Sequence, residues 1–169
     1  SDAPATEEIR RLRAGRGWQD DELVVMYSGN MGLGHLFDEI LAVAQRGTAE
    51  NVDEAGGDVR RFVFYGGGKR RIEVERFVEV HPDAPVELHD YVEGKELSTH
   101  LASADVHLVS LRPAWNGAMV PSKLQGIFAV GRPVIFIGSA DSSIGQWVTE
   151  SGGGWLVEPG DDEALQAAI

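Results

Sequence analysis

The chain has 169 residues, enough for one domain with a short extension, and its hydrophobic and charged fractions of 43% and 25% are typical of globular proteins. Its formal net charge is −12, which repels the phosphate backbone of nucleic acids and anionic lipid, so we expect no binding to nucleic acid or to anionic membrane surfaces. The absence of cysteine excludes disulfides, a thiol nucleophile and cysteine-ligated zinc. No apolar run approaches the roughly 20 residues of a membrane span and no signal-peptide pattern is present, so we expect a cytoplasmic protein.

Short apolar runs alternate with amphipathic stretches along the chain. The apolar runs predict buried strands at residues 23–27, 61–65, 86–89, 106–111, 133–137 and 154–157. The amphipathic stretches predict helices at residues 36–44, 69–78, 94–104, from 121 onward, 142–150 and 161–169. Strands that are apolar on both faces and joined by helices indicate a doubly wound parallel sheet of about six strands, in the α/β class. Ligands of such sheets bind beyond the carboxyl ends of the strands, so the loops at that edge hold the candidate site.

The first of these loops, residues 29–34, reads Gly-Asn-Met-Gly-Leu-Gly. Its glycines allow the backbone to approach a ligand closely, and the helix that follows offers free N–H groups to an anion. A tight turn that only requires positive φ is the alternative interpretation. A nicotinamide dinucleotide site is disfavoured, because the second strand ends in Tyr65 and three glycines where that site has an acidic residue for the ribose.

A second glycine run, residues 66–68, is followed by Lys69, Arg70 and Arg71. Three glycines and three cations at the carboxyl edge of the sheet can hold an anion. They can equally form a flexible turn and an exposed helix face, with the nearby glutamates of the helix as ion-pair partners. The sequence leaves both interpretations open.

Residues 106–140 contain no Asp or Glu, although they contain Arg112, Lys123 and Arg132. Within this segment Pro121 is well suited to the first position of a helix. A lysine in the first helical turn opposes the helix dipole, whereas a bound anion would reverse that effect by accepting from the N–H groups and from Lys123 together. We therefore favour an anion site here over a lysine that only extends into water.

Several motifs together resemble the C-terminal, donor-binding half of retaining GT-B glycosyltransferases. They are residues 27–32, 64–68, 104–108, 121–123 and 131–135, and they occur in the order found in that fold. The likeness is to the family 4, group 1 enzymes of bacterial polysaccharide or O-antigen assembly, and it extends from about residue 10 to the end. The implied fold is the Rossmann-like C-terminal half of GT-B.

The resemblance also implies the organisation and activity of the protein. Residues 1–20 would be an interdomain linker and leading helix, and residues 21–169 a nucleotide-sugar-binding domain that faces an N-terminal acceptor domain outside this chain. The donor would be a UDP- or GDP-sugar, from which a hexosyl-type sugar passes with retention to a glycan or lipid-linked acceptor. No metal ion or other cofactor is implied, and the histidines lack metal-ligand spacing. This domain would have no direct membrane contact, although the whole protein would be peripheral at the inner face of the membrane.

By the same resemblance, Lys123 and Asn30 are the candidate catalytic residues. The candidate binding residues are Gly29, Asn30, Gly32, Lys69, Tyr91, Val92, Gly117, Ser122, Lys123 and Gln125. The pair of glutamates usual in this family is missing, because Ala118 and Gly126 occupy the matching positions. The second glutamate normally binds the ribose, so Gln125 or the backbone would take its place. The alternatives are a dinucleotide- or ligand-binding module without transfer chemistry, and one half of a GT-B-type sugar-nucleotide epimerase.

Overall fold

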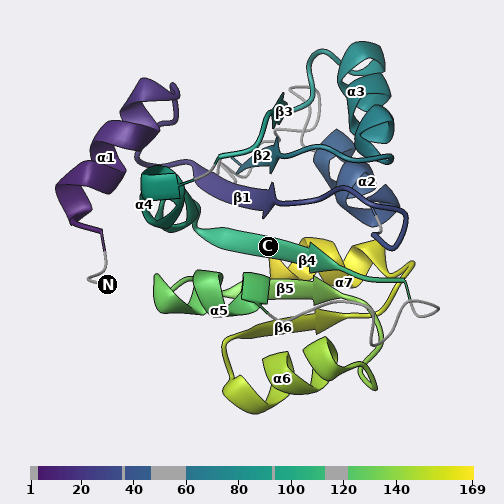
Figure 1. Ribbon diagram of the computed structural model, residues 1–169. Helices are drawn as coiled ribbons and strands as arrows, with labels where there is room; N and C mark the ends of the chain where they lie inside the picture. The colour runs from purple at the N-terminus through teal and green to yellow at the C-terminus, as the bar shows by residue number, and fades with distance from the viewer. Residues whose placement is uncertain (1–3, 36, 47–59, 93, 113–121) are drawn as a thin grey trace.

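The computed structural model describes residues 4–35, 37–46, 60–92, 94–112 and 122–169. A six-stranded, fully parallel sheet runs through the molecule in the order β3-β2-β1-β4-β5-β6 (Figure 1). The strands are β1 (Leu23–Ser28), β2 (Arg60–Tyr65), β3 (Val86–His89), β4 (Val106–Ser110), β5 (Val134–Ile137) and β6 (Gly154–Val157). The helices are α1 (Thr6–Gly15), α2 (Asp38–Arg46), α3 (Arg71–Val80), the 3-10 turn η1 (Gly94–Glu96), α4 (Leu97–Ala102), α5 (Ser122–Ala129), α6 (Ser143–Ser151) and α7 (Asp162–Ala168).

This architecture confirms the predicted doubly wound sheet, with differences at the ends of the helices. Helices α2 and α3, predicted at residues 36–44 and 69–78, begin two residues later than predicted, at Asp38 and Arg71, because the glycine loops before them extend further. Gly68, for example, has a φ of 129°, which a helix does not permit. The predicted helix over residues 94–104 divides into the 3-10 turn η1 and the short α4, and Gly94 at its start has a positive φ of 69°.

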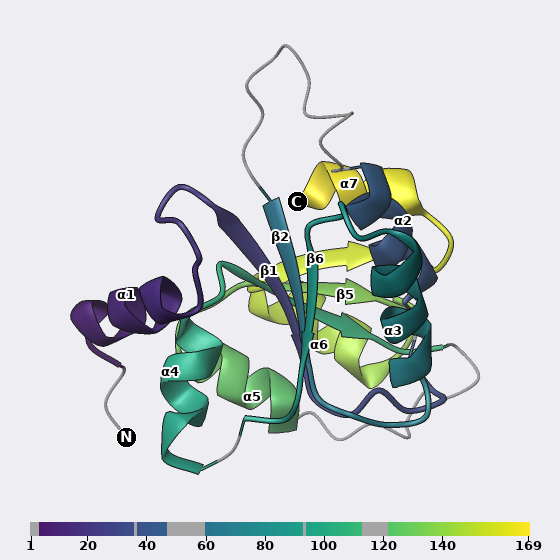
Figure 2. The ribbon, with the colours of Figure 1, turned by 90° about the horizontal axis from the view of Figure 1, so that it is seen from above.

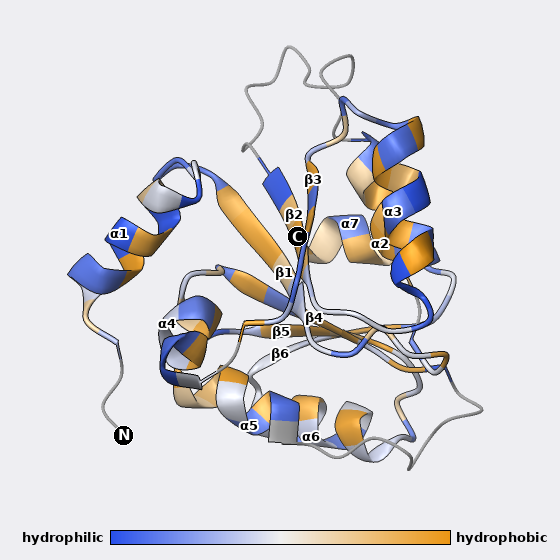
Figure 3. Cartoon of the chain, turned by 45° about the horizontal axis from the view of Figure 1, so that its top comes forward, coloured by the Kyte–Doolittle hydropathy of each residue, from blue (hydrophilic) through white to orange (hydrophobic). Residues whose placement is uncertain are grey.

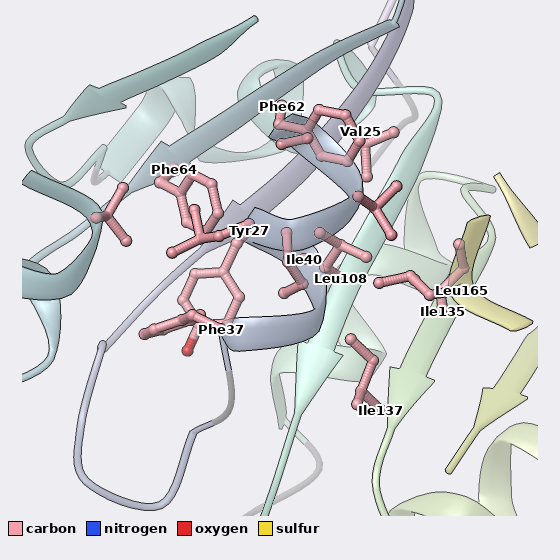
Figure 4. Close-up of a cluster of buried hydrophobic side chains, with 14 of the residues drawn as sticks. Val25, Tyr27, Phe37, Ile40, Phe62, Phe64, Leu108, Ile135, Ile137 and Leu165 are labelled. Atoms are coloured by element: carbon pink, nitrogen blue, oxygen red, sulfur yellow. The ribbon is translucent and has the colours of Figure 1, made fainter. Parts of the chain in front are cut away.

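Helices cover both faces of the sheet, and Figure 2 shows α2, α3 and α7 on one side and α1, α4, α5 and α6 on the other. Most residues of the strands are apolar, in agreement with their burial (Figure 3). The larger core lies under α2, α3 and α7, where aromatic side chains from two strands and a loop meet. Figure 4 shows Tyr27 and Phe64 from the sheet together with Phe37, and the Tyr27 and Phe37 ring centroids are 5.0 Å apart in an edge-to-face arrangement.

The leading helix α1 is anchored through one buried arginine. The Arg13 guanidinium donates to the carbonyl oxygens of Ser103, Gln19 and Glu22 and forms an ion pair of 3.2 Å with Asp105. The same Asp105 carboxylate accepts a 2.8 Å hydrogen bond from the Val24 backbone N–H. These bonds hold Arg13 in place, and α1 packs against α4.

The strand order places a topological switch between β1 and β4. The chain proceeds from β1 outward to β2 and β3, then returns to β4 on the other side of β1 and continues to β5 and β6. The connections that leave β1 and β4 at their carboxyl ends therefore diverge to opposite faces of the sheet. Ligands of open α/β sheets bind at such a point.

Candidate functional site

The two glycine loops form one continuous floor at the carboxyl edge of the sheet. The Gly29 N–H donates to the Tyr65 carbonyl oxygen over 2.8 Å, and the Met31 N–H donates to the Gly67 carbonyl oxygen over 2.7 Å. The Arg70 N–H in turn donates to the Met31 carbonyl oxygen over 2.8 Å. These bonds extend the pairing of β1 and β2 beyond the ends of the strands, so the two loops keep a fixed spacing.

That spacing requires a glycine at position 66. Its φ is 141°, and a Cβ atom there would lie 1.9 Å from the Gly29 carbonyl oxygen. Any side chain at this position would separate the two loops. Gly66 is therefore a structural glycine that allows close approach of two backbones.

Tyr27 connects the first glycine loop to α5. Its side chain is fully buried, and its hydroxyl donates a 2.6 Å hydrogen bond to the Asn30 carbonyl oxygen. The Lys123 Nζ atom lies 3.8 Å from the centre of the Tyr27 ring, within cation–π range. The same Nζ atom is 3.4 Å from the position that a Cβ atom would take at Gly29. Lys123 thus points to the glycine loop at the topological switch and not outward into water.

The Lys123 ammonium is a cation without a protein counter-ion. In the described part of the chain it forms no ion pair and donates no hydrogen bond. Burial lowers the pKa of Lys123 to about 7, because the charged form loses hydration that no carboxylate replaces. The neighbouring His35 imidazole bonds to the Ser110 carbonyl oxygen over 2.8 Å, and burial lowers its pKa as well. An anion at this position would stabilise the protonated lysine.

The cations after the second glycine run are arranged differently. Arg70 forms an ion pair of 2.8 Å with Glu73, and Arg71 forms ion pairs of 3.1 Å with Glu75 and 3.0 Å with Asp90. The predicted pairing with the glutamates of the helix is therefore confirmed for both arginines. Lys69 is exposed and has no ion-pair partner within the described residues.

The loop after β3 borders the second glycine run. The Tyr91 hydroxyl donates to the Gly67 carbonyl oxygen over 3.1 Å, and its ring lies against Gly66 and Gly67, although 51% of the side chain is exposed. Val92 packs partly buried against a small cluster that includes Tyr65. The predicted binding residues Tyr91 and Val92 therefore lie on the same edge as Gly29 and Lys123, with the second glycine run next to them.

The remaining predicted binding residues lie in the first glycine loop, on α5 or outside the described residues. Asn30 is exposed, and its amide lies beside Gly32 within the first loop. Gln125 is exposed on α5, and Ser122 is the first residue of that helix. Gly126 faces α4, where a Cβ atom would lie 3.4 Å from the Leu101 side chain. Gly117 and Ala118 lie outside the described residues.

Sequence reasoning did not identify Tyr27 as part of the site, and its apolar strand context indicated only a core residue. The signal that was available is its position, two residues before Gly29 at the end of a central strand. A buried tyrosine needs a hydrogen-bond partner, and the glycine loop that begins two residues after Tyr27 offers backbone carbonyl groups.

Two further observations concern the rest of the described chain. No group of three or more His, Asp or Glu residues there is placed to hold a metal ion, and no helix there is long and apolar enough to cross a membrane. A cavity of about 440 Å³ lies at the amino ends of β5 and β6, lined by residues that include Arg132 and Trp155. It is at the opposite edge of the sheet from Lys123 and is not part of the candidate site.

Residues 23–169 match the family model described as glycosyl transferases, group 1. The chain belongs to this family. Among the curated relatives, WcaI of Escherichia coli K12, named for a glycosyl transferase of colanic acid biosynthesis, is 30% identical over an alignment of 169 positions, which covers 98% of this chain and 39% of WcaI. WbjE of Pseudomonas aeruginosa, named as a glycosyltransferase, is 27% identical over 146 residues, which are 86% of this chain and 34% of WbjE. This glycosyl transferase domain thus spans less than half of the length of these relatives.

Solved structures agree with the family on the fold. The Anabaena protein HepE, solved in complex with UDP-glucose, superimposes with a TM-score of 0.72 over 97% of this chain and 42% of HepE, at 14% sequence identity. The glycosyl transferase domain therefore has the Rossmann-like fold of a GT-B half, as the sequence motifs predicted.

Proposed function

We propose that this domain binds the diphosphate of a nucleotide-sugar donor between its first glycine loop and the start of α5. The observation that carries the proposal is the unpaired Lys123 ammonium, held over the Tyr27 ring and directed at Gly29. Hydrogen bonds that involve a charged group are the strong ones, and a diphosphate provides the counter-charge that the protein does not.

Three features of the chain would act on the diphosphate together. The ammonium of Lys123 supplies the positive charge, and the first N–H groups of α5 point towards the same edge of the sheet. Gly29 and Gly32 present backbone without side chains, so that phosphate oxygens can approach closely. Asn30 is exposed beside them and is available to the transferred sugar. Tyr91 and Val92 would lie against the base.

The reaction we infer is transfer of a hexosyl-type sugar with retention to a glycan or lipid-linked acceptor. As the bond to the sugar breaks, negative charge develops on the departing diphosphate, and Lys123 with the N-terminus of α5 would stabilise that charge without a metal ion. The acceptor would bind to an N-terminal domain, and residues 1–20 would lead from that domain into this one. We therefore expect the 169-residue chain to bind donor but to transfer no sugar, and we expect the whole protein to act on the cytoplasmic side of the membrane.

The test is a calorimetric titration of the 169-residue chain with UDP and with GDP, because HepE was solved with a uridine nucleotide and the base is open. Lys123→Met is expected to weaken binding of the preferred nucleotide by about 10- to 100-fold, since a hydrogen bond to a charged group contributes about 1.5–3 kcal/mol. Arg132→Met is the matched control, because it removes the same charge at the opposite edge of the sheet. Equal losses in the two variants, or tighter binding of NADH than of either nucleotide, would contradict the proposal.

A further inference from the structure

A buried histidine contacts the residue that precedes the first glycine loop. His100, on α4, has no exposed surface, and its Nε2 atom is 2.9 Å from the hydroxyl oxygen of Ser28, the last residue of β1. The Tyr65 ring packs edge-to-face on the imidazole, with 4.6 Å between centroids, and stacks on the His89 ring on its other side, at 4.8 Å. The Arg16 guanidinium lies 4.9 Å from the Tyr65 ring. The contacts with Ser28 and with the Tyr65 ring fix the orientation of the His100 imidazole.

The hydrogen bonds of His100 determine what the Ser28 hydroxyl can do. The Nδ1 atom is buried and has no partner, and a buried N–H group without an acceptor is more costly than a bare ring nitrogen. The proton is therefore assigned to Nε2, which donates to the Ser28 oxygen. Burial lowers the pKa of His100 to about 3, so the ring is neutral at physiological pH. Ser28 accepts this bond, and its own O–H donor has no acceptor within the described residues.

Ser28 lies between the two parts of the candidate site, which are the first glycine loop with Lys123 and the loop that holds Tyr91. On one side it is followed by Gly29, next to the Lys123 ammonium. On the other side it pairs in register with Tyr65, which packs with Val92 and precedes Gly66 beside the Tyr91 ring. If the diphosphate binds at Lys123 and the base at Tyr91 and Val92, the ribose that joins them lies over Ser28. Ser28 is partly exposed, so a ligand at this edge can reach its hydroxyl.

We propose that the Ser28 hydroxyl binds a ribose hydroxyl of the donor nucleotide and that His100 is the residue that positions it; this rests on the function proposed above. Gly126, on the neighbouring α5, has no side chain that could serve instead, and it packs against Leu101 beside His100. The Ser28–His100 pair thus provides a hydrogen-bonding group in a part of the site where α5 provides none.

The experiment compares UDP, 2′,3′-dideoxy-UDP and inorganic pyrophosphate as ligands of the 169-residue chain by calorimetry. We expect the unaltered chain to bind UDP about three- to tenfold more tightly than the dideoxy nucleotide, which is the range of one uncharged hydrogen bond. Ser28→Ala should lower the UDP affinity by that factor and leave the affinities for the dideoxy nucleotide and pyrophosphate unchanged. A preference for UDP that persists in Ser28→Ala, or an equal loss for pyrophosphate, overturns the proposal.

His100 variants separate positioning from a merely structural role. His100→Leu should abolish the preference for UDP over the dideoxy nucleotide, while His100→Gln, whose amide nitrogen can take the place of Nε2, should retain it. If His100→Leu does not fold, Ser28→Ala and His100→Gln still decide the question. A chain that binds neither UDP nor pyrophosphate contradicts the proposed function itself. Pyrophosphate binding that depends on Lys123, without a preference that depends on Ser28, contradicts only the role of Ser28.

Discussion

Two segments of this domain place cations beside glycines at the same edge of the sheet, but the two arginines of one are paired with carboxylates, whereas Lys123 of the other has no ion pair among the described residues. At the second glycine run, Arg70 and Arg71 are neutralised by carboxylates of α3 and of the loop after β3. At the first glycine loop, Lys123 comes from a segment of 35 residues without Asp or Glu and has no carboxylate to pair with among the described residues. The carboxylates near a cation, rather than the cation itself, therefore indicate whether the cation is available to a ligand.

Gly66 and Gly67 of the second glycine run differ in how closely other backbone approaches them, and a pair of substitutions tests this. Gly66→Ala would place a Cβ atom on the Gly29 carbonyl oxygen and impose a strained φ, so we expect it to lower the free energy of unfolding by about 3 kcal/mol or more. In a thermal melt this corresponds to a fall in Tm of roughly 6–12 °C for a domain of this size. Gly67→Ala is the control, because its φ is ordinary and its Cβ atom would meet only the exposed Tyr91 ring. Similar melting temperatures for the two variants would show that the loops can separate at no cost.

The pH dependence of UDP binding separates the two kinds of cation. Lys123 has a pKa of about 7 in the free domain, and a bound diphosphate must raise it, so binding takes up a proton above pH 7. The affinity should fall by about tenfold per pH unit from pH 7 until the pH reaches the pKa of the complex. His35 contributes nothing in this window, because burial lowers its pKa and it is already neutral. Calorimetry in buffers of different ionisation enthalpy measures the proton directly.

The stability of the free domain should depend on pH with the opposite sign. The unfolded chain binds one more proton than the folded chain between the folded pKa of Lys123 and its ordinary value near 10.5, so the free energy of unfolding rises with pH across that window. Lys123→Met should remove both this rise and the proton uptake on UDP binding. A UDP affinity that stays constant from pH 7 to pH 9 in the unaltered chain would show that the lysine is already charged, or is not in contact with the nucleotide.

The fold could be predicted from the sequence because its signal is local. Apolar runs such as residues 23–27 and 133–137 are long enough to mark buried strands, and the alternation with helices leaves few other topologies. The sequence favoured an anion site at Lys123, but the contact of this lysine with Tyr27 and the first glycine loop could not be predicted, since it depends on the adjacency of β1 and β4, which are distant in the chain. The Ser28–His100 contact joins the end of β1 to α4, and the two residues are 72 positions apart in the sequence.

The smallest effect is expected for the neutralised cations. Arg71→Gln removes partly exposed ion pairs and the hydrogen bonds that the guanidinium donates to the Gly66 and His89 carbonyl oxygens, so it should lower the free energy of unfolding by about 1–2 kcal/mol and change the UDP affinity by less than about twofold. Its charge change equals that of Lys123→Met and it lies at the same edge of the sheet, so the pair of variants isolates the role of the local carboxylates. A tenfold loss of affinity in Arg71→Gln would mean that the guanidinium leaves Glu75 and Asp90 when the nucleotide binds. In that case the availability of a cation would be set by the ligand as much as by its neighbours, and Lys69 beside it would have to be tested in the same way.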